Sequence, residues 1–135
     1  MARITVVDDY PDFLGAMYAI LDGVEGHAVA AFDGATTVDE LVRSMPDLLI
    51  LDLHVVEEQD EQLGISTLAQ REPALHDVPI IICSGDVRRL RDQAPQLREH
   101  GIYTLEKPFD MSDLTALVDH ALREAAGSPR VNAQA

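Results

Sequence analysis

The stretch Leu48-Leu49-Ile50-Leu51-Asp52 (LLILD) decides the fold. Four consecutive apolar residues without polar alternation are typical of a parallel strand that is buried on both faces of a sheet. The acid that follows them marks the end of the strand. Similar stretches predict four further strands, at Ile4–Val7, Ala28–Phe32, Val78–Cys83 and Ile102–Leu105.

Helical patterns lie between several of these strands. Apolar residues recur every three or four positions over Phe13–Val24, Val38–Met45 and Leu114–Leu122. Thr37 followed by Glu40 matches a capping box, which predicts a helix start. The alternation of strands and helices predicts an α/β domain with an open parallel sheet and helices on both faces.

Composition and charge exclude several classes of protein. A chain of 135 residues with 47% hydrophobic residues can build one core, and we expect a domain over residues 1–124 with a flexible tail over 125–135. The formal net charge of −14 argues against direct nucleic-acid binding, which needs clustered cations. Short apolar runs and the lack of a signal-like N-terminus predict no membrane insertion. Cys83 is the single cysteine, which suits a reducing cytoplasm.

Polar residues follow successive predicted strands. Because the carboxyl ends of parallel strands meet at one edge of a sheet, we expect these side chains to converge there. Each of them alone has an ordinary explanation as a cap, a turn or a solvated side chain, but their joint occurrence indicates a site. The residues are Asp8, Asp9, Asp52, Ser84, Gly85 and Lys107.

These residue types point to phosphoryl transfer. Oxygen ligands from a few carboxylates suit Mg²⁺, which shares its remaining positions with water and phosphate. One carboxylate can attack phosphorus and form an aspartyl phosphate. Lys107 would hold one phosphoryl oxygen, Ser84 would donate a hydrogen bond to another, and Gly85 would leave space for the group.

The motifs VVDD, LLILD, IIICSG and LEKPF, in this order, resemble the receiver domain of two-component response regulators over residues 3–124. The resemblance implies a flavodoxin-like, doubly wound, five-stranded parallel sheet in a single-domain receiver. It also implies a phosphoryl donor, either a histidine kinase or a histidine phosphotransfer protein. A downstream partner protein would then read the phosphorylated surface.

The resemblance assigns roles to individual residues. Asp52 matches the phosphoacceptor, Lys107 the lysine that pairs with the phosphoryl group, and Ser84 the switch hydroxyl. Asp9 matches the direct Mg²⁺ ligand and Asp8 a ligand that acts largely through metal-bound water. The implied metal set is Asp8, Asp9, Asp52 and the backbone carbonyl of His54. The Lys107-Pro108 peptide is expected to be cis.

Three features depart from the family pattern. The switch aromatic is expected three residues before Lys107, where Thr104 stands, while Tyr103 lies one residue earlier. Either the strand shifts to place Tyr103 there, or the protein lacks the usual aromatic switch. Pro95 predicts that the helix before the last strand ends early or kinks. The loop after Asp52 is acidic and lacks the family's usual Pro and Gly spacing, so we expect it to be mobile. It either selects the kinase through its charge or is a tolerated surface insertion.

Two alternatives come from other classes. A haloacid-dehalogenase-like phosphatase also uses an aspartate nucleophile and Mg²⁺, but it needs a second Asp two residues later, where His54 stands. The other alternative is a receiver-like interaction module that is never phosphorylated. The preferred interpretation is a signalling receiver that is not an enzyme in the usual sense, since it catalyses only its own phosphorylation and dephosphorylation.

Overall fold

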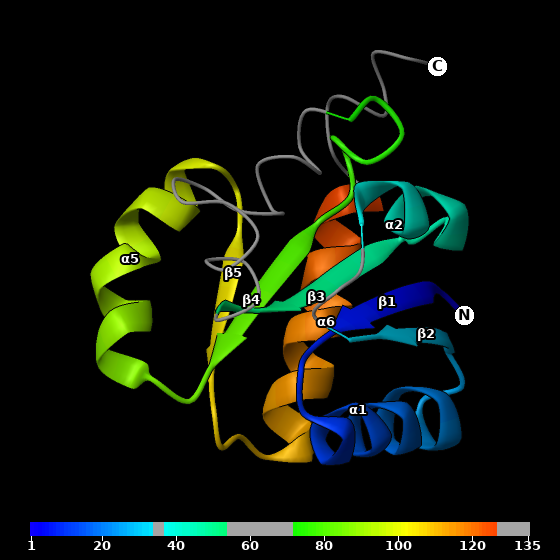
Figure 1. Ribbon diagram of the computed structural model, residues 1–135, viewed down its shortest axis with the longest axis horizontal. Helices are drawn as coiled ribbons and strands as arrows, with labels where there is room; N and C mark the ends of the chain where they lie inside the picture. The colour runs from blue at the N-terminus through cyan, green and yellow to red at the C-terminus, as the bar shows by residue number, and fades with distance from the viewer. Residues whose placement is uncertain (34–36, 54–71, 127–135) are drawn as a thin grey trace.

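The structure, a computed structural model, describes residues 1–33, 37–53 and 72–126. Its centre is a sheet of five parallel strands in the order β2-β1-β3-β4-β5 (Figure 1). This strand order is that of flavodoxin-like doubly wound folds, so the predicted fold class is confirmed. The strands are β1 (Arg3–Val7), β2 (Ala28–Phe32), β3 (Leu48–Asp52), β4 (Ile80–Ser84) and β5 (Tyr103–Glu106).

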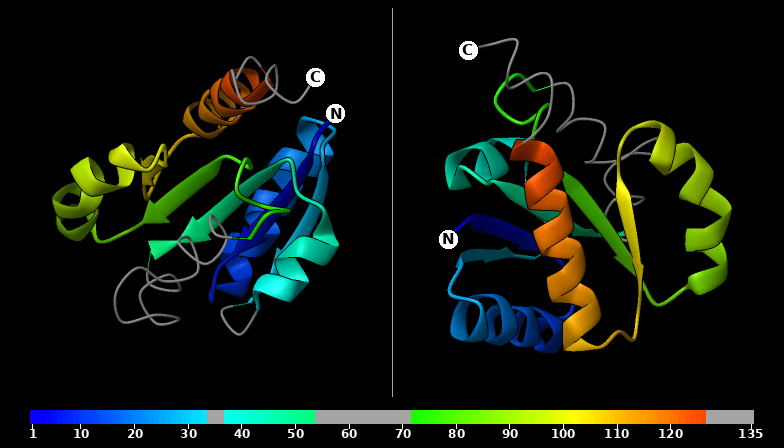
Figure 2. Two further views of the ribbon diagram at one scale, coloured as in Figure 1. Left: turned by 90° about the horizontal axis from the view of Figure 1, so that it is seen from above. Right: turned by 180° about the vertical axis from the view of Figure 1, so that it is seen from behind.

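Helices cover both faces of the sheet. The described helices are α1 (Pro11–Tyr18), the π-helical segment η1 (Ala19–Val24), α2 (Val38–Ser44), α5 (Val87–Glu99) and α6 (Met111–Ala126). Figure 2, in its right panel, shows α6 crossing the sheet when the molecule is seen from behind. The acidic loop after Asp52, and the helix that the alternating pattern predicts between β3 and β4, fall on residues 54–71, outside the described residues.

The continuous apolar runs are buried because each strand contributes to two hydrophobic clusters, one on each face. On one face, Leu48 and Ile50 of β3 pack with residues of α1, η1 and α6. On the other, Leu49 and Leu51 pack with residues of α2 and α5. Burying a side chain of this size stabilises the fold by roughly 1.5–3 kcal/mol. Asp52, the next residue, belongs by alternation to the α1/α6 face.

The local signals for α2 are confirmed. The Thr37 hydroxyl accepts a hydrogen bond from the backbone N–H of Glu40, over 3.3 Å. The helix ends at Ser44, before Met45 in the left-handed conformation (φ 51°). The Ser44 hydroxyl also lies 2.7 Å from the Thr5 hydroxyl of β1, which ties α2 to the sheet.

Pro95 was expected either to end its helix early or to kink it, and the early end is wrong, because α5 continues through Pro95 to Glu99. The kink stays a prediction. Proline removes one backbone donor, but the turn beyond it is held by other contacts. Leu97 packs against the core on the α2/α5 face, and its carbonyl accepts a hydrogen bond from the N–H of Ile102 over 3.0 Å. Tertiary packing therefore outweighs the loss of a single helical hydrogen bond.

The C-terminal part carries the remaining features. The Lys107-Pro108 peptide is cis, as expected. The last helix, α6, continues to Ala126, and the rest of the predicted tail lies outside the described residues. Within the described ranges, no helix combines the length and the hydrophobicity that a membrane span requires.

Candidate functional site

Strand register brings three of the predicted site residues to one edge of the sheet. Val7 of β1 pairs with Leu51 of β3. The next residues, Asp8 and Asp52, therefore lie side by side at the carboxyl ends of these two strands. Lys107 follows β5 directly, on the far side of β4. Side-chain alternation places all three residues on the α1/α6 face of the carboxyl edge.

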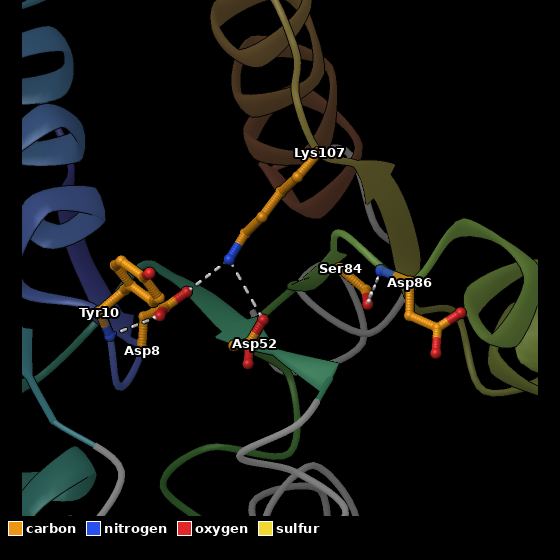
Figure 3. Close-up of polar contacts among 6 residues, drawn as sticks. All are labelled: Asp8, Tyr10, Asp52, Ser84, Asp86 and Lys107. Carbon is orange, nitrogen blue, oxygen red and sulfur yellow. Dashed lines mark hydrogen bonds and ion pairs between the residues drawn. The ribbon is translucent and has the colours of Figure 1, made fainter.

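The three side chains form one ion cluster (Figure 3). The Lys107 ammonium donates to Asp8 Oδ2 over 2.8 Å and to Asp52 Oδ1 over 3.2 Å. The side chains of Asp8, Asp52 and Lys107 are only 4%, 12% and 22% exposed, so water screens these charges weakly. Asp8 Oδ1 also accepts a hydrogen bond from the N–H of Tyr10 over 2.9 Å, which fixes its carboxylate.

The environment keeps Lys107 charged. Burial acts to lower the pKa of Lys107, while its hydrogen bond to Asp8 and the charges of Asp52 and Asp8 act to raise it. The net pKa lies above the ordinary value for lysine. The group facing the two carboxylates at neutral pH is therefore an ammonium ion.

An aromatic ring completes the surroundings of this ammonium. Lys107 Nζ lies 3.9 Å from the centroid of the Phe13 ring on α1. Phe13 meets Phe109 edge to face, with ring centroids 6.0 Å apart. Helical spacing placed Phe13 on an apolar helix face and gave no sign of a role in the site, because spacing does not show which way a distant lysine points.

Ser84 lies at the end of the neighbouring strand β4 and is buried, with 6% exposure. Its hydroxyl oxygen accepts a hydrogen bond from the N–H of Asp86 over 3.0 Å, and its carbonyl accepts from the N–H of Lys107 over 2.8 Å. Since the hydroxyl accepts in the first of these contacts, it retains its own proton for donation. Gly85 stands beside Lys107, where an added Cβ would meet Lys107 Cβ at 4.0 Å.

The carboxylates suit a hard cation. Asp8 and Asp52 come from different strands yet both contact one ammonium, so a single cation can reach oxygens of both. Asp9, next to Asp8, is exposed. In the described part of the chain, no three His, Cys, Asp or Glu side chains are close enough together to hold a metal ion as they stand. The oxygen chemistry of the set nevertheless fits Mg²⁺, and His54 lies outside the described residues.

Tyr103 and Thr104 lie on opposite faces of β5. Tyr103 contacts α6, where its hydroxyl donates to Glu124 Oε2 over 2.6 Å and its ring meets that of His120 edge to face. Burial, together with the hydrogen bond to Glu124, raises the pKa of Tyr103 to about 12. Thr104 pairs with Ile82 and belongs by alternation to the α2/α5 face. The tyrosine thus contacts α6 rather than the face that carries Thr104.

Cys83 is a core residue. It is fully buried against the α1/α6 cluster, and this burial raises the pKa of its thiol to about 12. A thiol with such a pKa stays protonated at neutral pH and is a poor nucleophile.

Comparison with known proteins gives the family. The chain matches the response regulator receiver domain over residues 4–119, and it belongs to that family. It is therefore a receiver domain of the two-component response regulators, a family of signalling modules. Protein Rrf1 of Nitratidesulfovibrio vulgaris is 31% identical over 129 residues, covering 95% of this chain and 88% of that protein.

Solved structures agree in fold. NtrX of Brucella abortus, in complex with ADP, superposes with a TM-score of 0.76 and 26% identity, covering 97% of this chain but only 29% of NtrX. The receiver domain of a sensor histidine kinase from Pseudomonas aeruginosa superposes with a TM-score of 0.70 and 21% identity, covering 90% of this chain and 97% of that one. That structure has a magnesium ion coordinated in the active-site cleft.

Proposed function

We propose that this receiver accepts a phosphoryl group on Asp52 and signals through a partner protein that binds the phosphorylated form. The observation that carries the proposal is the Lys107 ammonium, which contacts both Asp8 and Asp52 at the carboxyl edge of the sheet. A fixed ammonium beside a carboxylate nucleophile is suited to phosphoryl transfer, which depends mainly on positioning and charge neutralisation.

The proposed reaction forms one bond and breaks one. An Asp52 carboxylate oxygen attacks phosphorus, and the bond from phosphorus to the donor atom breaks. That donor atom is a histidine nitrogen in a kinase or phosphotransfer protein, or the acyl oxygen of a small acyl phosphate. Lys107 turns from Asp52 to a phosphoryl oxygen, and Ser84 donates its hydroxyl proton in a hydrogen bond to another.

The proposed metal site uses Asp8, Asp9 and Asp52, with the backbone carbonyl of His54 as a further ligand. When bound, Mg²⁺ supplies positive charge that offsets the negative charge on the phosphoryl oxygens. Magnesium in the cleft of the Pseudomonas aeruginosa receiver supports this proposal. Asp8 is held by both Tyr10 and Lys107, so this carboxylate is oriented beforehand.

The wider setting is proposed on the same basis. The phosphoryl donor is a histidine kinase or a histidine phosphotransfer protein in the cytoplasm, and the receiver unit spans residues 1–124. Because the switch position carries Thr104 and Tyr103 contacts α6, we propose that Ser84 and Thr104 carry the response to phosphorylation. Tyr103 would take no part in that response.

Acetyl phosphate tests the chemistry without a kinase. We expect intact-protein mass spectrometry to show one added phosphoryl group on the wild type in the presence of Mg²⁺, and none when the metal is chelated. Asp52→Asn should take up no phosphoryl group, because its amide lacks the negatively charged oxygen that attacks phosphorus. Asp39→Asn, an exposed acid in the first turn of α2, serves as the matched control and should label like the wild type.

The outcomes separate the alternatives. Equal labelling of Asp52→Asn and wild type would assign the reaction to another residue. No labelling of the wild type by acetyl phosphate or by any phosphorylated histidine kinase would favour the interaction module that is never phosphorylated. Turnover of a small phosphate ester would favour a phosphatase.

A further inference from the structure

The Lys107 ammonium has three sides in contact with protein groups. Two are the carboxylates of Asp8 and Asp52, and the third is the face of the Phe13 ring, whose centroid lies 3.9 Å from Nζ. A cation over an aromatic face is attracted by the negative face of the ring, and the attraction grows when water is excluded. Phe13 therefore adds an attractive contact to those that the ammonium makes with its two anionic partners.

The ring itself is held from two directions. Met17 follows Phe13 by one helical turn on α1 and is 1% exposed, so this face of the helix is anchored in the core. Phe109 meets Phe13 edge to face, with an interplanar angle of 81°. Since Phe109 lies only two residues after Lys107, one segment supplies both the cation over the ring and the ring that packs against it.

We propose that Phe13 is a positioning residue for Lys107. Its ring keeps the ammonium between Asp8 and Asp52 in the free receiver, so the lysine stands beside the phosphoacceptor before a donor arrives. This inference rests on the proposed function for its effect on phosphorylation. The contact between the ring and the ammonium can be tested without that function.

The contact can be observed without overlapping signals, because Lys107 is the single lysine of the chain. Protein grown with isotope-labelled lysine gives one set of lysine side-chain signals in an NMR spectrum. The protons next to Nζ should be shifted by the ring current of Phe13 in the wild type. In Phe13→Leu this shift should disappear, and in Phe13→Tyr it should remain, because tyrosine keeps the ring.

Phosphorylation by acetyl phosphate gives the second measurement. We expect Phe13→Leu to lower the initial rate of Asp52 labelling by about threefold to tenfold, from the usual strength of such contacts. Phe13→Tyr should restore a rate close to wild type. Leu14→Ala is the matched control for stability, since Leu14 is a partly buried neighbour on α1 that packs against the same core. It should leave the lysine signals and the labelling rate per folded molecule unchanged.

The two measurements fail separately. An unshifted lysine signal in the wild type, or one unchanged in Phe13→Leu, would overturn the proposed contact. If the ring-current shift disappears in Phe13→Leu but the labelling rate stays at the wild-type value, Phe13 contacts the ammonium without positioning it for phosphorylation. If wild-type protein takes up no phosphoryl group, the proposed function fails, while the loss of the ring-current shift in Phe13→Leu still establishes what holds Lys107.

Discussion

The ammonium of Lys107 lies 2.8 Å from the carboxylate of Asp8, although 99 positions separate them in the chain. The same ammonium contacts Asp52, so it offsets the charge of two acids that the fold places side by side. Without such a cation, neighbouring carboxylates with little exposure would repel each other and lose solvation. Lys107 is thus a structural counterion in the free receiver as well as the proposed phosphoryl-binding residue.

Removing this counterion should destabilise the protein. Lys107→Met keeps the apolar stem but removes the ammonium that contacts both Asp8 and Asp52. We expect a loss of about 1–3 kcal/mol, less than for a fully buried pair because the cluster stands at the edge of the sheet. Urea unfolding at neutral pH measures it. Arg91→Met is the control, since Arg91 pairs with Glu106 at the surface and should change stability little.

The stability of Lys107→Met relative to the wild type tests this role of the lysine. If Lys107→Met is as stable as the wild type, the two carboxylates do not need the lysine, and the ion cluster makes no net contribution to folding. In that case Asp52→Asn should also leave stability unchanged.

Magnesium should stabilise the folded receiver, because a ligand that binds only the folded state raises the melting temperature. Asp9→Ala should abolish the rise that Mg²⁺ causes and leave the metal-free protein no less stable, since Asp9 is exposed. Differential scanning calorimetry with and without Mg²⁺ checks both points, with Asp39→Ala as a control. A large loss of metal-free stability in Asp9→Ala would make this carboxylate structural instead.

Cys83 should be protected from alkylation in the folded protein. Its thiol is buried and its pKa is raised to about 12 by that burial, so neither access nor thiolate is available at neutral pH. Iodoacetamide should react quickly only in urea. Rapid labelling without denaturant would mean that β4 opens frequently.

The same shift predicts a dependence of stability on pH. The thiol pKa is about 12 in the folded protein against 9.0 as the ordinary value, so the unfolded chain releases this proton first. The contribution of Cys83 to stability is therefore complete below about pH 9 and is lost as the pH rises toward 12. Urea unfolding of the wild type should weaken more steeply over this range than that of Cys83→Ala. Parallel curves for the two proteins would count against the shift.

Tyr103 should behave as a packing residue. Tyr103→Phe removes the hydrogen bond to Glu124 but keeps the ring contact with His120, so we expect a loss of at most about 1 kcal/mol. The labelling rate with acetyl phosphate should stay as in the wild type. Tyr18→Phe, at an exposed position on α1, is the matched control. A marked change in the labelling rate of Tyr103→Phe would show that the tyrosine hydroxyl takes part in the reaction.

The five strands could be predicted because short continuous apolar runs such as Leu48–Leu51 are typical of buried parallel strands. The ends of the strands shifted by a residue or two, as at Ile80, where hydrogen bonding rather than hydrophobicity decides the boundary. The continuation of α5 beyond Pro95 could not be predicted, because local propensity does not register the packing of Leu97. The change from α-helix to π-helix at Ala19 was not predicted either, since the residue spacings of the two helices differ little over one turn.

The site was predictable to the extent that it depends on strand ends. Asp8, Asp52 and Lys107 meet because parallel strands finish at one edge, and the chain order alone gives that result. The role proposed for Phe13 depends on the direction of a side chain from another element, which no pattern within α1 contains. The side of β5 that Tyr103 occupies depends on register, and this became clear only from its pairing with Ile81.

The position of Lys107 directly after the last strand has a consequence for protein synthesis. A ribosome adds roughly 5–20 residues each second, so about 5–20 seconds pass between the making of Asp8 and the making of Lys107. During that interval the growing chain carries Asp8, and later also Asp52, before the ammonium of Lys107 has been made. A chain cut short before β5 lacks it permanently. Only a chain that extends through Lys107 can therefore place an ammonium against Asp8 and Asp52.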